Sequence, residues 1–234
     1  MCGRFTLATP AEDLQRAFPG FAFPDQMPLR YNIAPSLEVA LVPNNGENRV
    51  QHFRWGLVPP WAKDPKIGNR MINARSETLA EKPSFRTAFR KRRCLILADG
   101  FYEWRKHPGI SAKTPVYIRL ESGEPFAFAG LWESWKQPDA PPLLSCTIIT
   151  TQPNALVKKI HHRMPVILPP GAYDRWLDPA EQQPDRLADL LKPYPHADMT
   201  AYPVSTLVNN PGADTLACIK PAETQAQPDQ PSLF

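Results

Sequence analysis

The residue at position 2 is a cysteine that follows the initiator methionine. A small residue after Met1 is the usual condition for removal of that methionine, and its removal makes Cys2 the N-terminal residue. An N-terminal cysteine carries an amine and a thiol on neighbouring carbons, and such a pair condenses with aldehydes. The amine forms an imine, and the thiolate then closes a five-membered thiazolidine ring, an intramolecular step with an effective molarity on the order of 10⁵ M or more. Cys2 is therefore a candidate nucleophile toward a carbonyl group; an ordinary cysteine near a frayed terminus is the alternative.

A second candidate group is a pair of carboxylates in the apolar stretch from Ile96 to Trp104. Period-two alternation places Asp99, Phe101 and Glu103 on one face of a strand. A carboxylate among aromatic residues is either paired with a cation or has a raised pKa, which makes it a useful acid or base. The stretch thus predicts either a structural ion pair or a general acid–base residue.

The segment from residue 71 to 77 alternates in the same way and places Asn73, Arg75 and Glu77 on one side. A carboxamide beside an arginine can hold a phosphate or a sugar hydroxyl, and the same pair is equally common in the scaffold of a loop. Both interpretations stay open at this point.

Two adjacent histidines, His161 and His162, lie between apolar residues in the segment 160–165. In an extended backbone their side chains point to opposite sides, so only one of them is expected to enter a given pocket. A general acid–base role and a purely structural role are the two alternatives for that histidine.

The elements that must position these residues are short. Helix signals and helical periodicity predict helices at 10–19, 84–91, 172–177 and 185–191. Apolar runs predict strands at 39–42, 52–58, 94–104, 116–120, 126–131, 145–151 and 164–168, with a hairpin turn at Asn45 and Gly46 between the first two. Strands that follow one another without long helices favour an antiparallel or mixed sheet of the α+β class.

The composition is that of a globular chain. Hydrophobic residues make up 42% and charged residues 21% of the 234 residues, so neither a disordered chain nor a disulfide-stapled miniprotein fits. The 29 prolines predict many short elements joined by rigid loops. No signal peptide or membrane span is predicted, and we expect a cytoplasmic protein, associated with the nucleoid if it is bacterial. The segment 222–234 is polar and rich in proline, and it is expected to be a disordered tail after a single domain at 2–221.

The cysteines and histidines predict no metal site. The four cysteines contain no Cys-x-x-Cys pair, and the five histidines have no metal-ligand spacing. Cys94, Cys146 and Cys218 lie in short apolar runs and are expected to be buried, reduced thiols.

The net charge of +4 permits an anionic partner without requiring one. One segment, 82–93, carries six basic residues and no acidic residue. It is either a solvated helix face or a contact for nucleic-acid phosphates.

Taken together, the singular segments resemble a known family. In chain order they are Cys2-Gly3-Arg4-Phe5, Tyr31-Asn32-Ile33-Ala34-Pro35, Trp55-Gly56-Leu57 with Pro59 and Trp61, Ile72-Asn73-Ala74-Arg75-Ser76-Glu77, Asp99-Gly100-Phe101-Tyr102-Glu103-Trp104, Thr150-Thr151, Ile160-His161-His162-Arg163-Met164-Pro165 and Pro203-Val204-Ser205. This combination resembles the SOS-response-associated peptidase family, whose members process abasic sites and cross-link to DNA. The resemblance extends from Cys2 to about Pro221.

The resemblance implies a single α+β domain with a twisted, partly barrel-like, mostly antiparallel β-sheet flanked by short helices. It also implies a basic channel, ending at Cys2, that binds single-stranded DNA containing abasic sites. We further expect a monomer without cofactor or metal. Cys2 is then the residue that forms the thiazolidine with the ring-opened sugar, Asn73 holds the sugar, Glu103 serves imine formation and His161 assists opening of the sugar ring. The DNA contacts implied are Arg4, Pro35, Trp61, Arg75 and Thr150, with Arg4 and Arg75 as phosphate anchors and Trp61 as the stacking residue.

One departure from the family concerns stacking, because some members have two successive tryptophans where this chain has Trp61-Ala62.

Three alternatives to cross-linking remain open. The chain could be an N-terminal-cysteine peptidase or hydrolase, for which self-removal of Met1 would be one turnover. It could be an abasic-site lyase that acts through a Schiff base, or a non-catalytic RNA-binding domain that uses the basic segment and Trp61.

Overall fold

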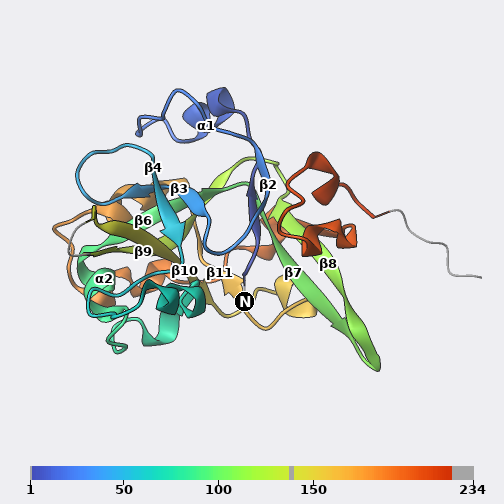
Figure 1. Ribbon diagram of the computed structural model, residues 1–234. Coiled ribbons are helices and arrows are strands. Elements are labelled where there is room, and N and C mark those ends of the chain that lie inside the picture. The colour runs from blue at the N-terminus through green and yellow to red at the C-terminus, as the bar shows by residue number, and fades with distance from the viewer. Residues whose placement is uncertain (1, 137–139, 223–234) are drawn as a thin grey trace, which may run out of the picture.

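Five strands close on themselves into a barrel in the computed structural model, which describes residues 2–136 and 140–222 (Figure 1). Neighbouring strands are antiparallel except at one seam, where β10 and β4 pair in parallel and close the ring. The order around the barrel is β3 (Glu38–Pro43), β4 (Gln51–Trp55), β10 (Leu143–Thr151), β9 (Phe126–Trp135) and β6 (Arg93–Ala98). β6 is buried along its whole length, which explains its unbroken apolar run.

A second, fully antiparallel sheet lies against the barrel (Figure 1). Aromatic side chains join the two: the ring centroid of Phe5 lies 5.1 Å from that of Trp55 and 5.7 Å from that of Phe128. Phe101 reaches the same Phe128 ring at 6.1 Å. The sheet contains, in order, β13 (Met199–Pro203), β8 (Ile110–Leu120), β7 (Gly100–His107), β1 (Phe5–Leu7) and β2 (Arg30–Ile33).

The chain passes from the barrel to the second sheet at Asp99. The single strand predicted at 94–104 is therefore wrong: β6 ends at Ala98 and β7 begins at Gly100. The Asp99 carboxylate accepts hydrogen bonds from the Thr6 hydroxyl, from the Ala8 N–H at 2.5 Å and from the Thr9 hydroxyl at 2.9 Å. These bonds draw the end of β1 onto the crossover, so Asp99 has a structural role that Glu103 does not share.

Gly100 is required at this crossover for steric reasons. A Cβ atom on Gly100 would lie only 2.2 Å from the hydroxyl oxygen of Tyr117 on the neighbouring strand β8. A larger residue at position 100 would displace the Tyr117 side chain, whose hydroxyl oxygen lies 2.9 Å from that of Thr6.

Short strands extend the barrel beside β10. β5 (Asn73–Arg75) pairs with β10 in parallel, and β11 (Met164–Pro165) pairs with it antiparallel. The predicted strand at 164–168 is divided, because Val166 donates its N–H to Ile149 and accepts from the N–H of Ala129. The following β12 (Ile167–Leu168) consequently pairs with β9 instead.

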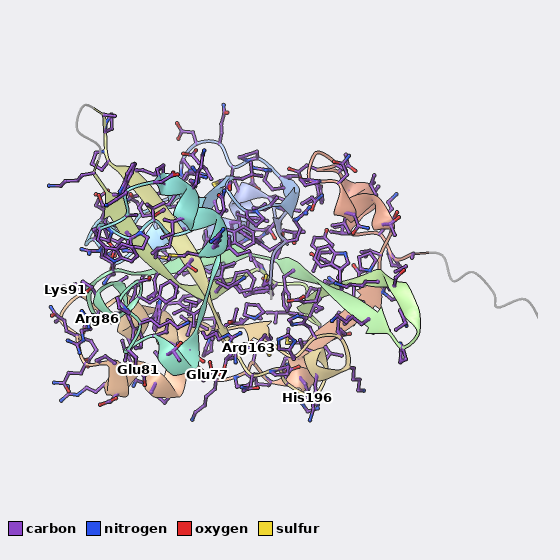
Figure 2. All side chains as sticks on the ribbon, turned by 60° about the horizontal axis from the view of Figure 1, so that its bottom comes forward. Glu77, Glu81, Arg86, Lys91, Arg163 and His196 are labelled. Atoms are coloured by element: carbon purple, nitrogen blue, oxygen red, sulfur yellow. The ribbon has the colours of Figure 1, made fainter. Side chains whose placement is uncertain are left out.

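The α-helices lie outside the sheets and are short: α1 (Ala11–Ala17), α2 (Arg86–Lys91) and α3 (Tyr173–Leu177). Figure 2 labels Arg86 and Lys91 on α2, and both are exposed. The helix predicted at 185–191 is a 3₁₀ helix. The 3₁₀ helices are η1 (Pro65–Arg70), η2 (Ser76–Thr78), η3 (Val157–Lys159), η4 (Pro170–Ala172), η5 (Pro184–Leu190), η6 (His196–Asp198), η7 (Thr206–Asn209) and η8 (Leu216–Cys218).

The α+β class and the partly barrel-like, mostly antiparallel sheet with flanking short helices are thus confirmed. The proposed division into a domain at 2–221 and a tail at 222–234 stays a prediction, because all of the tail except Ala222 lies outside the described residues. Within the described part of the chain, no helix is long and apolar enough to cross a membrane.

Candidate functional site

Cys2 lies three residues before the start of β1, where the second sheet meets the barrel, and it is fully buried. Its carbonyl oxygen accepts a 2.8 Å hydrogen bond from Nδ2 of Asn73, the first residue of β5. Its thiol faces the carbonyl oxygen of Arg4 at 3.8 Å. Burial raises the pKa of the Cys2 thiol above its ordinary value, and the negative charge of Glu103 raises it further. A base must therefore take the thiol proton before the sulfur can react.

Glu103 and His161 face each other beside Cys2. Glu103 Oε1 lies 3.8 Å from His161 Nδ1, and the Glu103 residue is only 2% exposed. Burial raises the pKa of Glu103 to about 7, and burial lowers the pKa of His161 to about 4. Near neutral pH a substantial fraction of Glu103 is protonated while the His161 imidazole is neutral.

Nδ1 of His161 contacts the backbone of Arg163 in two ways. It lies 3.1 Å from the Arg163 N–H, which can donate to it, and 3.2 Å from the Arg163 carbonyl oxygen, to which a protonated Nδ1 would donate. The two contacts are compatible with different tautomers, so either ring nitrogen can carry the proton of the neutral imidazole. The role of His161 in opening the sugar ring stays a prediction.

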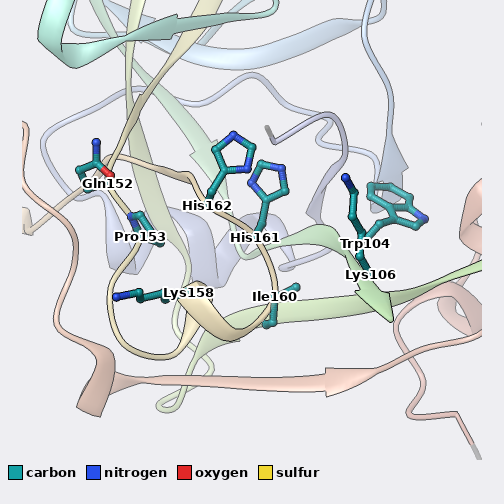
Figure 3. A pocket seen from close by; sticks show the side chains of 8 residues that line it. All are labelled: Trp104, Lys106, Gln152, Pro153, Lys158, Ile160, His161 and His162. Carbon is teal, nitrogen blue, oxygen red and sulfur yellow. The ribbon is translucent and has the colours of Figure 1, made fainter. Parts of the chain in front are cut away.

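The prediction that His161 and His162 point to opposite sides is wrong. Their ring centroids are 4.2 Å apart with 32° between the planes, and both rings line one pocket (Figure 3). The backbone is not extended here, because η3 precedes the pair and the His161 N–H bonds to the carbonyl oxygen of Val157 at 2.8 Å. A turn, unlike a strand, brings neighbouring side chains to the same side.

Arg163 is a site residue that the sequence patterns did not single out. Its Nη1 and Nη2 contact the two Glu77 carboxylate oxygens at 2.5 and 2.9 Å, and Nη2 also donates to the Thr150 carbonyl at 2.6 Å (Figure 2). The bonds from Arg163 lower the pKa of Glu77 to about 2. The one feature of the sequence that could have indicated Arg163 is its position directly after the two histidines. Because its own N–H holds His161, the Arg163 ion pair orients the imidazole.

Strand β5 contains Asn73, which contacts Cys2, and Arg75, but not Glu77. β5 ends at Arg75, and Glu77 lies in η2, so the predicted alternation of the three residues ends after two. The Asn73 Oδ1 atom is buried and accepts no hydrogen bond from the described residues. The Arg75 side chain is exposed.

The other residues expected to contact DNA differ in accessibility. Thr150 lies opposite Arg75 in the register of β10 and β5, but it is fully buried, with its hydroxyl 3.4 Å from the Ala74 carbonyl oxygen. Pro35 follows β2 and is half-buried. Trp61 lies in the loop after β4 and is 57% exposed, which suits a stacking surface. The roles of these three residues stay predictions.

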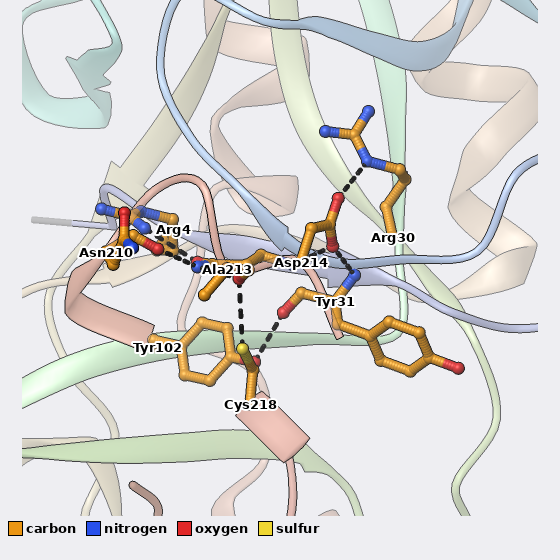
Figure 4. A network of polar contacts seen from close by, with 9 residues as sticks. Arg4, Arg30, Tyr31, Tyr102, Asn210, Ala213, Asp214 and Cys218 are labelled. Atoms are coloured by element: carbon orange, nitrogen blue, oxygen red, sulfur yellow. Dashed lines mark hydrogen bonds and ion pairs between the residues drawn. The ribbon is translucent and has the colours of Figure 1, made fainter. Parts of the chain in front are cut away.

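Arg4 is engaged within the protein (Figure 4). Its Nη1 donates to Asn32 Oδ1 at 2.8 Å and to the Val208 carbonyl at 3.0 Å. Asn32 Nδ2 in turn donates to the carbonyl oxygens of Asn210 and Ala213. The Arg4 guanidinium thus ties the strand that follows Cys2 to the segment after β13, and its expected role as a phosphate anchor stays a prediction.

The basic segment 82–93 is divided between structure and surface. Arg93 is fully buried and donates to the carbonyls of Phe89 and Arg90 at the end of α2, and to those of Trp176 and Asp178 at the end of α3. Arg92 pairs with the buried Glu133 at 2.8 Å. The remaining basic residues of the segment are exposed: Lys82, Arg86, Arg90 and Lys91.

Cys94, Cys146 and Cys218 are buried free thiols, as expected for them. In the described part of the chain, no group of three or more His, Cys, Asp or Glu residues could hold a metal ion.

The site thus consists of a buried cysteine at position 2, where the second sheet meets the barrel, beside the Glu103 carboxyl group and the His161 imidazole. The family model for the SOS response associated peptidase (SRAP) matches residues 1–211, and the chain belongs to this family. The resemblance inferred from the sequence segments is confirmed.

Individual relatives agree with this assignment. "Abasic site processing protein YoqW" of Bacillus subtilis (strain 168) is 51% identical over 214 residues, which cover 90% of this chain and 95% of that protein. "Abasic site processing protein HMCES" of Rattus norvegicus is 31% identical over 272 residues, covering 95% and 76%. A crystal structure of a protein from Bacteroides thetaiotaomicron superposes with a TM-score of 0.85 at 27% identity, covering 95% and 100%.

Proposed function

We propose that this protein recognises abasic sites in single-stranded DNA and forms a thiazolidine between Cys2, after removal of Met1, and the ring-opened sugar. The proposal agrees with the names of the relatives. The observation that carries it is Glu103, a buried carboxyl group with a pKa of about 7 whose charge acts on the Cys2 thiol and whose Oε1 lies 3.8 Å from His161. A cross-link of this kind would protect the lesion during the DNA damage response.

The first step is opening of the sugar, because an abasic sugar is mostly a closed hemiacetal without an aldehyde. In this step the C1 hydroxyl loses its proton to solvent, the bond between C1 and the ring oxygen breaks, and the ring oxygen takes a proton from solvent and becomes a hydroxyl. His161, in the tautomer that carries its proton on Nε2, donates a hydrogen bond to the ring oxygen and stabilises the charge that develops there. The product of this step is the open-chain aldehyde at C1.

The second step is imine formation. The Cys2 amine forms a bond to C1, and the carbonyl oxygen becomes the hydroxyl of a carbinolamine. The protonated Glu103 carboxyl gives its proton to that hydroxyl, which leaves as water, and a protonated imine remains. A raised pKa is what such a donor needs near neutral pH.

The third step closes the ring. The Glu103 carboxylate takes the thiol proton, and the sulfur bonds to C1, whose double bond to nitrogen becomes a single bond. Glu103 is protonated again, and the whole reaction has lost one water without oxidation or reduction. The raised pKa of the Cys2 thiol makes this base necessary.

Asn73 and the exposed side chains supply recognition. Asn73 holds the Cys2 carbonyl through Nδ2, and its Oδ1 is free of protein donors in the described residues, so it can accept a sugar hydroxyl. Since the lesion has no base, affinity must come from phosphates and from stacking on neighbouring bases. Arg75 and Trp61 are the exposed residues we assign to these contacts.

Two further activities would use the same groups. The imine can lose the 3′ phosphate by β-elimination, which is lyase chemistry and competes with ring closure. Hydrolysis of the Met1 to Cys2 peptide bond by water would be a peptidase-like maturation step. Both belong to the proposal as consequences of a reactive N-terminal cysteine.

A gel experiment tests the proposed function. The protein is incubated with a single-stranded oligonucleotide that carries one abasic site, and the products are separated under denaturing conditions. We expect a heat-resistant adduct whose mass is the sum of the two reactants less one water. An intact oligonucleotide is the matched control. RNA binding without an adduct, or peptide cleavage without an adduct, would overturn the proposal in favour of the corresponding alternative.

A further inference from the structure

A cavity of about 600 Å³ opens beside His161 on the side of β7 and the loop after β10 (Figure 3). This volume is in the range of small-ligand sites. None of the residues that the sequence indicated as DNA contacts lines it. The lining residues are Trp104, Lys106, Gln152, Pro153, Lys158, Ile160, His161 and His162.

The charge of this cavity is positive. Lys106 and Lys158 are its cationic lining residues, and no aspartate or glutamate lines it. Both lysines are exposed, and among the described residues neither ammonium group forms an ion pair with a carboxylate. An anionic group is therefore favoured there.

Planar side chains occupy the same cavity. The Trp104 indole donates a 2.8 Å hydrogen bond from Nε1 to Asn209 Oδ1. The His161 and His162 rings are tilted by 32° to each other, with their centroids 4.2 Å apart. Aromatic surfaces next to cations are the combination on which a nucleotide binds without base-specific readout.

We propose that this cavity is a subsite for a nucleotide directly adjacent to the lesion, with its base against Trp104 or His162 and its phosphate at Lys106 and Lys158. The inference rests on the proposed function and adds a contact that the sequence did not indicate. Through this subsite the protein would bind the nucleotide next to the abasic sugar, on the side of the sugar that faces His161. The contact brings the sugar and His161 together before any covalent step.

Binding measurements test this subsite without the chemistry. A fluorescent single-stranded oligonucleotide that carries a tetrahydrofuran abasic analogue, which has no aldehyde, is titrated at several salt concentrations. We expect the Lys106→Ala, Lys158→Ala double variant to bind about tenfold more weakly at low salt. Its slope of log K against log salt should be smaller by about 0.7 for each phosphate that the variant no longer binds. Lys192→Ala, which removes an exposed lysine elsewhere, is the matched control and should change neither quantity.

The flank is identified with neutral linkages. Oligonucleotides in which a methylphosphonate replaces the phosphate on the 5′ or the 3′ side of the analogue are compared with the wild type and the double variant. On the contacted side the methylphosphonate should weaken wild-type binding and should not weaken the double variant further. Additive losses on both sides, or equal losses in Lys192→Ala, would overturn the subsite.

The two proposals fail differently. If the wild type forms no adduct with an aldehyde-bearing oligonucleotide but the binding results hold, the covalent function falls and the subsite stands. If the adduct forms and the lysine variants bind as the wild type does, the subsite falls and the covalent function stands.

Discussion

Glu103 Oε1 lies 3.8 Å from His161 Nδ1, and the pKa values of the two groups are the reverse of their usual order. The carboxyl group has a pKa of about 7 and the imidazole a pKa of about 4, in both cases chiefly because burial disfavours the charged form. An ion pair is consequently not the dominant state near neutral pH. The pair offers one transferable proton on Glu103 and one N–H on the neutral His161 imidazole, which are the two groups that the proposed ring opening and imine formation need.

The first prediction concerns the pH dependence of cross-linking. Dehydration of the carbinolamine needs protonated Glu103, so the single-turnover rate should fall as the pH rises above about 7. Glu103→Gln should be slower by about 10²–10⁴-fold, and the loss of rate above pH 7 should vanish. If Glu103→Gln kept the wild-type dependence of the rate on pH, the group that titrates near pH 7 would be one other than Glu103.

Glu103 should also link stability to pH. Its pKa of about 7 in the folded protein exceeds the ordinary 4.5, because the buried carboxyl group is more easily accommodated in its protonated form. The contribution of Glu103 to the free energy of unfolding is therefore highest below pH 4.5 and decreases as the pH rises through 7. Glu103→Gln removes this loss and should be more stable than the wild type at pH 8 by on the order of 2–3 kcal/mol, with little difference at pH 4.5. Urea unfolding at both pH values measures the difference, and an equal difference at both would refute the linkage.

The second residue to test is Cys2. Cys2→Ala keeps the N-terminal amine but removes the sulfur that closes the ring, so the stable adduct should disappear while borohydride still traps an imine. Some strand cleavage by β-elimination is expected to accompany it. A heat-resistant adduct from this variant without reductant contradicts the thiazolidine.

His161 can be separated from Glu103 by the substrate. His161→Ala should slow the reaction with an abasic sugar by about 10²-fold or more and should matter much less for an aldehyde that cannot cyclise, because that aldehyde needs no ring opening. Glu103→Gln should slow both, since imine formation is common to them. An equal defect of His161→Ala on both substrates would place His161 at the imine or ring-closure step.

The two arginines near the site should behave differently. Arg75 is exposed, so Arg75→Ala should reduce the slope of log K against log salt by about 0.7, the amount expected when one phosphate is no longer bound. Arg4 is bonded to Asn32 and Val208, so Arg4→Ala should chiefly lower the maximal cross-linking rate by displacing Cys2. If the slope of log K against log salt decreased equally in the two variants, Arg4 would bind a phosphate as Arg75 does, and this prediction would be wrong.

Local patterns were sufficient for much of the fold. The apolar runs at 39–42, 126–131 and 145–151 lie in strands, and the helix predicted at 84–91 appears as α2. The short strands β1, β2 and β13 escaped prediction because three to five residues carry too little periodicity. Closure of the barrel also escaped, because the pairing of β4 with β10 joins residues about 90 positions apart, and no local pattern encodes such a contact.

The sequence by itself determined the chemistry that is available: a cysteine at position 2, an amide, carboxylates and histidines within a recognisable set of segments. Only the tertiary structure decided how those groups are used. Asp99 lies at the crossover between the two sheets, whereas Glu103 lies in β7 of the second sheet. The His161 and His162 rings lie on the same side of the chain, and Arg163 forms an ion pair with Glu77. The physical reason is that a pKa and a hydrogen-bond partner depend on burial and on neighbours from distant parts of the chain. Residue type sets the ordinary pKa, and the packing of β1, β5 and β7 shifts it.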